Sequence, residues 1–323
     1  MAEMLRQFVA NYMPDSDFAV SNVTKSLSGR SRQNWNFDLI WRSPSGTVIE
    51  PLILRRDPDG GLVQTDRARE FSILSSLEGS PVPSPIGRWL DANGTYFGRP
   101  ALIMRREPGE CDYYVVNSDR PVEERLDLAR NICDLLVEVH RTDLVSTGLS
   151  DLIGQPDDPA LAQLVEWEAV LRSDQIEPYP EIDLTLVWLN ETKPSPTDIV
   201  LVHGDFKPGN ILLDHGQITA LLDWELAHIG DPAEDLGWVT QPLRKREHMI
   251  ANVWESDQML ERYEAQSGRQ ITKTTVRWWQ VFATFRTAVM QVSGLKSFIE
   301  GRSPEPYRPT ARVLEALLDG IQD

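Results

Sequence analysis

Hydrophobic residues near the start of the chain follow a pattern that predicts β-strands. Within the strand-rich stretch 18–56, the runs 35–41 and 48–54 are dense in β-branched and aromatic residues, which pack well on a pleated surface. The sequence Ser-Pro-Ser-Gly at 43–46 separates the two runs, and such residues favour a turn. We therefore predict a β-hairpin.

A helix and a second pair of strands follow this hairpin. Apolar positions in 66–77 recur at helical spacing until Pro81 interrupts the pattern, as expected of a helix with one buried face. The runs 86–90 and 100–104 lie on either side of the turn sequence Asp-Ala-Asn-Gly at 91–94. This arrangement predicts two further strands.

The pattern becomes helical after Gly109. Pro121 suits the first position of a helix, and apolar residues continue from it at helical spacing as far as His140. The same spacing predicts helices over 159–172, 180–190, 247–266, 272–298 and 308–321. Short apolar runs at 199–202, 210–213 and 218–222 interrupt the helices and predict a small β element. Trp278 and Trp279 share the apolar face of one predicted helix, where we expect core or a pocket wall.

This order of elements indicates an α+β protein with two lobes. With the Pro108-Gly109 pair as the boundary, we expect a small β-rich lobe over 1–107 and a larger, mostly helical lobe over 108–323. The composition is 41% hydrophobic and includes 10 Trp, which excludes a disordered chain.

Charge is distributed unevenly between the two predicted lobes. The formal net charge is −17, and such an acidic chain lacks the Lys and Arg clusters that a nucleic-acid-binding protein needs. The first 107 residues carry 13 basic and 12 acidic side chains, whereas the remainder carries 19 and 37. The acidic excess favours a solvated acidic exterior, and the alternative is a cleft that attracts a cation.

The two cysteines, Cys111 and Cys133, form no Cys-x-x-Cys motif. We interpret both as packing residues of a protein kept in a reducing compartment. The chain has no run of about 20 apolar residues and no long apolar segment in its first 13 residues. We therefore expect a cytoplasmic protein without a membrane partner.

Acidic residues carry the chemical signal. The sequence has no GxxxxGK[ST], no GxGxxG after a strand, no HExxH and no GxSxG. It does have His203-Gly-Asp205 and Asn210 after the apolar run 199–202, and Asp223 directly after the run 218–222. Carboxylate and amide oxygens suit Mg²⁺, which binds few protein groups and leaves room for substrate phosphates. A carboxylate that is free of metal can accept a proton from a hydroxyl, so this set predicts phosphoryl transfer.

These residues make the sequence resemble the aminoglycoside phosphotransferase family. The spacing of Asp205 and Asn210 matches the kinase pattern H-R-D-x-x-x-x-N, with His-Gly-Asp here. The resemblance implies a two-lobed, protein-kinase-like fold and Asp205 as catalytic base. It also implies that Asn210 and Asp223 bind Mg²⁺ and that Asp235 supports the catalytic loop. His203 is expected to pack and to form hydrogen bonds there.

The resemblance also assigns nucleotide contacts in the small lobe. A loop that covers the phosphates of the nucleotide is expected at 26–34, with Ser28, Gly29 and Arg30 as its contact residues. Arg55 occupies the position of the kinase lysine, with Arg56 as the alternative, and Glu70 matches the glutamate that orients this cation. The segment 104–107, which includes Met104 and Arg106, is expected to form the hinge against adenine.

Within the family, the segment 222–232 and the Leu54-Arg-Arg sequence most resemble kinase-like domains linked to acyl-CoA dehydrogenases. That branch implies a Mg²⁺-dependent kinase that transfers phosphate from ATP or GTP to a hydroxyl of a small molecule of the hydroxyacyl-CoA type. It also implies a functional link to an acyl-CoA dehydrogenase. The alternatives are an aminoglycoside O-phosphotransferase and a kinase fold that has lost catalysis and acts as a binding protein. We do not expect a protein kinase, because no activation segment follows Asp223.

Overall fold

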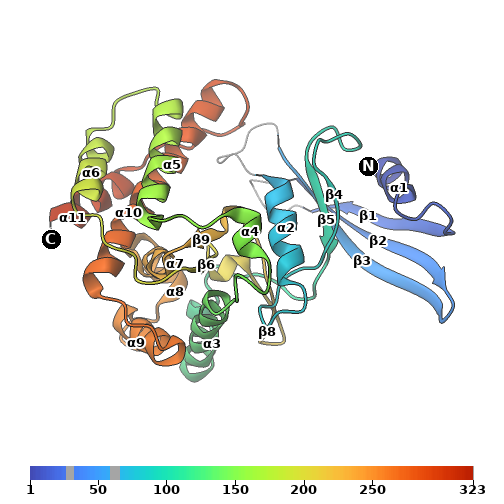
Figure 1. The fold of residues 1–323 in the computed structure, drawn as a ribbon, viewed down its shortest axis with the longest axis horizontal. Helices are drawn as coiled ribbons and strands as arrows, with labels where there is room; N and C mark the ends of the chain where they lie inside the picture. The colour runs from blue at the N-terminus through green and yellow to red at the C-terminus, as the bar shows by residue number, and fades with distance from the viewer. Residues whose placement is uncertain (27–32, 59–65, 323) are drawn as a thin grey trace.

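The computed structural model of the chain describes residues 1–26, 33–58 and 66–322. It has a small lobe built around a sheet and a large lobe of helices, joined side by side (Figure 1). The predicted α+β architecture with two lobes is confirmed. The predicted phosphate loop residues Ser28, Gly29 and Arg30 lie outside the described residues.

The small lobe contains one antiparallel sheet with the strand order β1-β2-β3-β5-β4. The predicted hairpin is present, with Ser43 opposite Gly46 where the chain turns. The predicted second strand pair and the helix between the pairs are also present. The elements of this lobe are α1 (Ala2–Ala10), β1 (Phe18–Lys25), β2 (Gln33–Ser43), β3 (Gly46–Arg56), α2 (Arg67–Leu77), β4 (Gly87–Asp91) and β5 (Ala101–Arg105).

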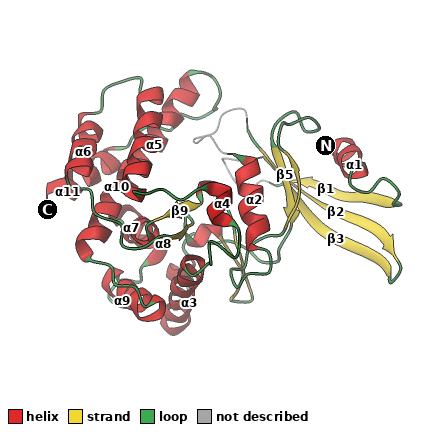
Figure 2. Ribbon diagram, viewed as in Figure 1, coloured by secondary structure: helices red, strands yellow, loops and turns green. Residues whose placement is uncertain are grey.

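The two helices of the small lobe belong to different hydrophobic cores. Helix α1, which the sequence analysis did not predict, buries Leu5, Phe8 and Val9 in a core with strand residues such as Phe37. Helix α2 lies between the sheet and the large lobe (Figure 2), and its Ile73 joins the core of the large lobe. The small lobe is therefore attached to the large one through α2.

The large lobe is mostly helical, and Trp278 and Trp279 of its helix α10 are buried as predicted. Its helices are α3 (Val122–His140), α4 (Leu149–Ile153), α5 (Pro159–Asp174), α6 (Pro180–Glu191), α7 (Pro232–Thr240), α8 (Lys245–His248), α9 (Ser256–Ser267), α10 (Lys273–Ile299) and α11 (Ala311–Gln322). Its strands are β6 (Val200–Val202), β7 (Ile211–Asp214), β8 (Gln217–Leu221) and β9 (His228–Gly230).

Two predictions were wrong in detail. The single helix expected over 247–266 is two helices, because residues 249–255 form an irregular connection in which Ile250 pairs with Trp254. Cys111 is exposed rather than packed, because it lies in the connection after Gly109, outside any helix or strand, while Cys133 is buried as expected.

Among the residues described, none of the helices is both long and apolar enough to cross a membrane.

The hairpin β7–β8 touches both lobes. Glu110, just after the predicted hinge, exchanges backbone hydrogen bonds of 3.0 and 3.1 Å with Leu213 of β7. On β8, the Leu221 N–H donates to the carbonyl of Pro83 at 2.7 Å. The hairpin is thus bonded to the segments that enter and leave the β4–β5 pair.

Candidate active site

The loop that follows β6 carries Asp205. Its path depends on Gly204, which has a left-handed φ of +80°, a conformation that glycine adopts without strain. A Cβ atom at this position would lie 2.7 Å from the carbonyl oxygen of Leu226. The loop therefore needs glycine immediately before Asp205.

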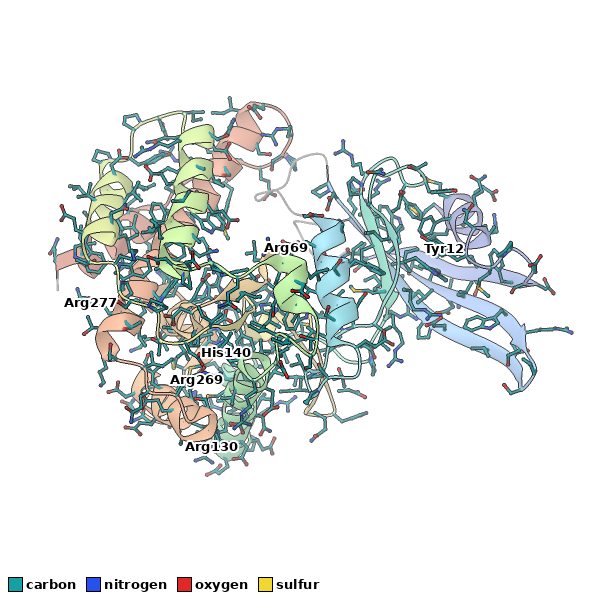
Figure 3. All side chains as sticks on the ribbon, in the orientation of Figure 1. Tyr12, Arg69, Arg130, His140, Arg269 and Arg277 are labelled. Carbon is teal, nitrogen blue, oxygen red and sulfur yellow. The ribbon has the colours of Figure 1, made fainter. Side chains whose placement is uncertain are left out.

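Asp235, in the first turn of α7, fixes the backbone of this loop. Its carboxylate accepts hydrogen bonds from the N–H groups of His203 at 2.7 Å and Gly204 at 2.9 Å. The ring of His140, which is labelled in Figure 3, lies in the large lobe. It contacts the same carboxylate at 3.2 Å and Tyr263 at 2.7 Å. Burial alone would raise the pKa of Asp235, but its hydrogen bonds with His140 and the loop outweigh burial and lower the pKa. An ionised Asp235 fixes the backbone next to Asp205.

His203 connects the Asp205 loop to the end of β8. Its Nε2 lies 3.0 Å from the carbonyl oxygen of Leu222, and its Nδ1 accepts from the N–H of Asp205 at 3.2 Å. Burial lowers the pKa of this imidazole, so the neutral ring donates through Nε2. The Leu222 N–H in turn donates to the carbonyl of Asn210 at 2.7 Å. These bonds bring Asp205, Asn210 and the residue before Asp223 together.

Asp205 has two polar neighbours from its own loop. The Asn210 amide nitrogen donates to the carboxylate of Asp205 at 3.0 Å and to its carbonyl at 2.9 Å. Lys207 forms an ion pair with the same carboxylate. Burial would lower the pKa of Lys207, but the charge of Asp205 outweighs burial and raises it. Lys207 therefore remains a cation beside the predicted base.

Asp223 follows β8 in a left-handed conformation with φ of +68° and faces the small lobe. Arg55 of β3 donates to the Asp223 carboxylate at 2.6 Å and to Glu70 of α2 at 2.8 Å. Arg56 points to the other face of the strand, where it bonds to Gln33 and the carbonyl of Phe97. The structure thus places Arg55, rather than Arg56, between Glu70 and Asp223.

The sequence analysis missed a second arginine beside Arg55. Arg67, at the start of α2, is buried and pairs with Glu70 and with Asp57 at 2.8 Å. It also lies 3.6 Å from Glu225. The available signal was the spacing of Arg67 and Glu70, three residues apart just after the helix-capping Asp66, because residues at that spacing share a helix face.

The predicted hinge residues lie along the end of β5. Met104 is buried and pairs with Ile53 of β3. The Arg106 guanidinium bonds to Asp38 of β2 at 3.0 Å, and Glu107 pairs with Arg105 at 2.8 Å. These contacts place the segment on the small-lobe sheet, and its binding of adenine stays a prediction.

The donor set at Asn210 and Asp223 fits Mg²⁺. The Asn210 amide nitrogen is used by Asp205, which leaves its carbonyl oxygen as the end suited to a hard cation. Asp223 supplies a carboxylate that it shares with Arg55. The described residues contain no cluster of three or more His, Cys, Asp or Glu side chains with metal-binding geometry. An amide oxygen and a carboxylate are hard oxygen donors, the kind of protein ligand that Mg²⁺ accepts in small number.

Several basic side chains of the large lobe lie over aromatic rings, and one of them is Lys207, the ion-pair partner of Asp205. Lys207 lies over the ring of Tyr113 at 5.9 Å, and Arg246 lies over Tyr114 at 4.6 Å. Arg244 stacks on the ring of Trp238 at 4.0 Å and acts electrostatically on Lys207. The predicted base thus has cations nearby even though the large lobe is acidic as a whole.

Sequence and structure comparisons relate this chain to known proteins. The sequence model of the phosphotransferase enzyme family matches residues 30–279. Acyl-CoA dehydrogenase family member 11 from Mus musculus is 30% identical over 241 residues, which cover 72% of this chain and 29% of that protein. Acyl-CoA dehydrogenase family member 10 from Mus musculus is 30% identical over 193 residues, 58% of this chain and 18% of that protein. The chain thus spans less than a third of these relatives.

One relative and two solved structures are matched over most of their own length. The aminoglycoside 3'-phosphotransferase of Streptomyces fradiae is 27% identical over 224 residues, 64% of this chain and 74% of that protein. A crystal structure of a protein from Ralstonia eutropha JMP134 aligns with a TM-score of 0.72 at 21% identity, covering 99% of this chain and 95% of that one. The aminoglycoside phosphotransferase APH(4)-Ia, bound to ADP and hygromycin B, aligns with a TM-score of 0.61 at 15% identity, covering 98% and 97%.

Proposed function

The chain belongs to the phosphotransferase enzyme family, and we propose that it transfers the γ-phosphoryl group of ATP or GTP to a hydroxyl of a small molecule. In this proposal residues 1–107 hold the nucleotide, and residues 108–323 supply the base and hold the acceptor. The two unpaired cysteines favour a reducing compartment, and we propose a cytoplasmic location.

The observation that carries the proposal is the joining of Asp205, Asn210 and Asp223 through hydrogen bonds at Leu222 and His203. In the reaction the acceptor oxygen bonds to the γ-phosphorus as the bond from that phosphorus to the β–γ bridging oxygen breaks. Asp205 takes the proton of the hydroxyl. Mg²⁺, when held by Asn210 and Asp223, would neutralise charge on the phosphates. Positioning and charge stabilisation account for most of phosphoryl-transfer catalysis.

The small lobe supplies cationic groups for the phosphates. Arg55 is held by Glu70 on one side and by Asp223 on the other, so its guanidinium lies next to the proposed metal ligand. An arginine fork binds phosphate oxygens well. We assign Arg55 to the nucleotide phosphates, together with the loop residues Ser28, Gly29 and Arg30. We assign Met104 and Arg106 to the hinge against the base of the nucleotide.

For the acceptor we favour an anionic hydroxyl compound of the hydroxyacyl-CoA type. Lys207 pairs with Asp205, and Arg244 acts electrostatically on Lys207. These two cations suit an acceptor that carries phosphate or carboxylate groups, and Arg246, which lies over Tyr114, is a further candidate contact. The similarity to acyl-CoA dehydrogenase family members supports the same class. It also supports a functional link between this kinase and an acyl-CoA dehydrogenase.

An aminoglycoside acceptor is the second candidate. The excess of acidic residues in 108–323 and the similarity to the Streptomyces fradiae enzyme favour a cationic acceptor. A resistance assay in a sensitive bacterial host separates the two: protection against kanamycin-type drugs supports the antibiotic, and its absence supports the metabolite.

Calorimetric titration of ATP, with and without Mg²⁺, tests the nucleotide site. We expect metal-dependent binding that is lost in Asp223→Ala and retained in Asp214→Ala, which changes a half-exposed aspartate on the same hairpin. Absence of nucleotide binding by the unaltered protein would contradict the proposed function. It would favour the alternative of a kinase fold that acts as a binding protein for another ligand.

A further inference from the structure

His228, the first residue of β9, has a hydrogen-bond acceptor at each of its two ring nitrogens. Nδ1 lies 2.9 Å from the carbonyl oxygen of Leu226, and Nε2 lies 3.0 Å from Oε2 of Glu234. The side chain of His228 is 12% exposed, and that of Glu234 is 2% exposed. A neutral imidazole has a single N–H, so both bonds form only when the ring carries two protons.

Glu234 links this ring to the loop that carries Asp205. Its other oxygen, Oε1, accepts from Nη1 of Arg286 at 3.0 Å. The Nη2 of Arg286 donates to the carbonyl oxygen of Gly204, the residue before Asp205. Arg286 and Glu234 are both 1% exposed. One buried carboxylate is therefore shared by two cations, and the second cation holds the catalytic loop.

The charged groups around His228 favour its protonated form. Glu234 comes from α7 and Glu166 from α5, and both act electrostatically on the ring. The 3-10 helix Trp224–Leu226, which supplies the Leu226 carbonyl, also carries Glu225, and α4 carries Asp151. Strand β6, which pairs with β9, has no titratable residue. Burial lowers the pKa of His228, but the carboxylate of Glu234 outweighs burial and raises it above its ordinary value.

We propose that protonated His228 is a positioning residue, which acts through Glu234 and Arg286 to fix the Gly204 carbonyl and hence the loop that presents Asp205. Loss of its proton at alkaline pH leaves one of its two contacts without a hydrogen and places two acceptors against each other. Glu234 is then fixed less firmly on the His228 side, so the carboxylate and the Arg286 bonded to it can shift together, and the loop at Gly204 gains freedom. The effect on turnover rests on the proposed kinase function, whereas the protonation state does not.

Histidine-selective NMR tests the protonation state without any need for activity. The chain has five histidines, and the signal lost in His228→Gln assigns the ring. We expect an imidazolium at pH 7 that titrates above the ordinary histidine pKa of about 6.5. A neutral His228 ring at pH 7 overturns the proposal.

The pH profile of turnover tests the positioning role. In the unaltered protein we expect kcat to fall as pH rises through the His228 pKa. His228→Gln, which keeps one neutral hydrogen bond to Glu234, should lack this fall and show a kcat about 10- to 100-fold lower at neutral pH, as expected when a catalytic group is misplaced. Its KM for ATP should be unchanged. His215→Asn, which changes an exposed histidine with 95% side-chain exposure, should behave as the unaltered protein. Identical profiles for His228→Gln and the unaltered protein overturn the proposal.

Failure of the proposed function would leave this inference testable. If the unaltered protein shows no turnover, the kinase proposal fails, and the pH dependence of unfolding replaces the kinetic measurement. Because the folded-state pKa is raised, His228 stabilises the fold fully below about pH 6.5. That stabilisation is lost as pH rises through the folded-state pKa. As pH rises, the denaturation midpoint should decline less in His228→Gln than in the unaltered protein, which would support the inference. Equal declines in the two proteins would overturn it.

Discussion

The two sides of the candidate active site are built in different ways. On the large-lobe side, Asp205 lies on a loop fixed by hydrogen bonds within one lobe, from Asp235, His203 and Arg286. On the small-lobe side, Arg55 is held by ion pairs, and one of them crosses to Asp223 in the large lobe. The first arrangement is complete without a ligand, whereas the second joins the same groups that nucleotide and metal would use.

This difference in construction indicates which residues stabilise the fold and which bind the nucleotide. Buried backbone N–H groups that pair with one carboxylate have no alternative partner. Removal of that carboxylate therefore leaves them without an acceptor and destabilises the fold. A guanidinium shared among carboxylates can exchange one anion for another, since phosphate oxygens accept the same N–H groups. We therefore expect the large-lobe residues to govern folding and catalysis, and Arg55 to govern nucleotide affinity.

The largest effect is expected for Asp205→Asn. Loss of the proton acceptor should reduce kcat by about 10²- to 10⁴-fold, the usual range for a general base. The unfolding free energy should also fall, because Lys207 loses its ion-pair partner, although the amide keeps an oxygen for Asn210. Steady-state ADP formation with an identified acceptor measures the first quantity, and urea denaturation measures the second. Wild-type turnover in this variant would remove Asp205 from the base role.

The next effect is expected for Asp235→Ala. It leaves the N–H groups of His203 and Gly204 buried without their acceptor and should lower the unfolding free energy by about 3–5 kcal/mol. Urea denaturation checks the value. Asp257→Ala removes an aspartate whose side chain is 61% exposed and should change it by less than about 0.5 kcal/mol. A similar loss in both variants would contradict the structural role of Asp235.

A smaller effect is expected at acidic pH, where the protonation of His248 should lower the free energy of unfolding. Burial and the charges of Arg244 and Lys207 lower the pKa of His248 to about 3, whereas the unfolded chain takes up this proton near pH 6.5. Stability due to the neutral ring is thus present above pH 6.5 and is lost as pH falls toward 3. Between pH 7 and pH 5 this loss should reach about 2 kcal/mol. His248→Phe should show a smaller loss by urea denaturation, and His215→Asn an unchanged one. Equal losses in His248→Phe and the unaltered protein would exclude His248 as the source.

Arg55→Lys should have the smallest effect. A single ammonium cannot make the forked contacts of a guanidinium, and the loss of one hydrogen bond to a charged group should weaken MgATP binding about tenfold, or about 1.4 kcal/mol. Isothermal titration measures it. The matched control is Arg56→Lys on the opposite face of β3, which should retain affinity. Weaker binding in the control alone would reverse the assignment of the two arginines.

Local sequence patterns predicted the framework of the fold. The hairpin β2–β3, the helix α2 and most large-lobe helices follow from periodic apolar residues and turn-forming sequences, which act over short distances. Helix α1 was missed although Leu5, Phe8 and Val9 have helical spacing, because a nine-residue segment contains few repeats of the helical period. The break after α8 escaped prediction because the apolar spacing continues through residues in non-helical contacts.

The candidate site was predictable where its residues stand close together in the sequence. His203, Asp205, Asn210 and Asp223 form one motif, and the structure brings these positions together. Arg286 was not predicted, since 82 residues separate it from Gly204 and its neighbours are those of an ordinary buried helix. No chemical role was predicted for His228, because its partner Glu234 is recognisable only when β9 packs against α7. Contacts of this kind depend on tertiary packing.

The hairpin β7–β8 places Asn210 just before its first strand and Asp223 just after its second. The register of these strands therefore determines the distance between the two proposed metal ligands. One residue inserted into either strand would turn its side chains to the opposite face and shift one ligand against the other. The turn at His215 and Gly216 lies outside the strands, between the paired ends Asp214 and Gln217, so a longer loop there can leave the strand pairing unchanged. During evolution, insertions should therefore accumulate at this turn and be rejected from the strands beside it.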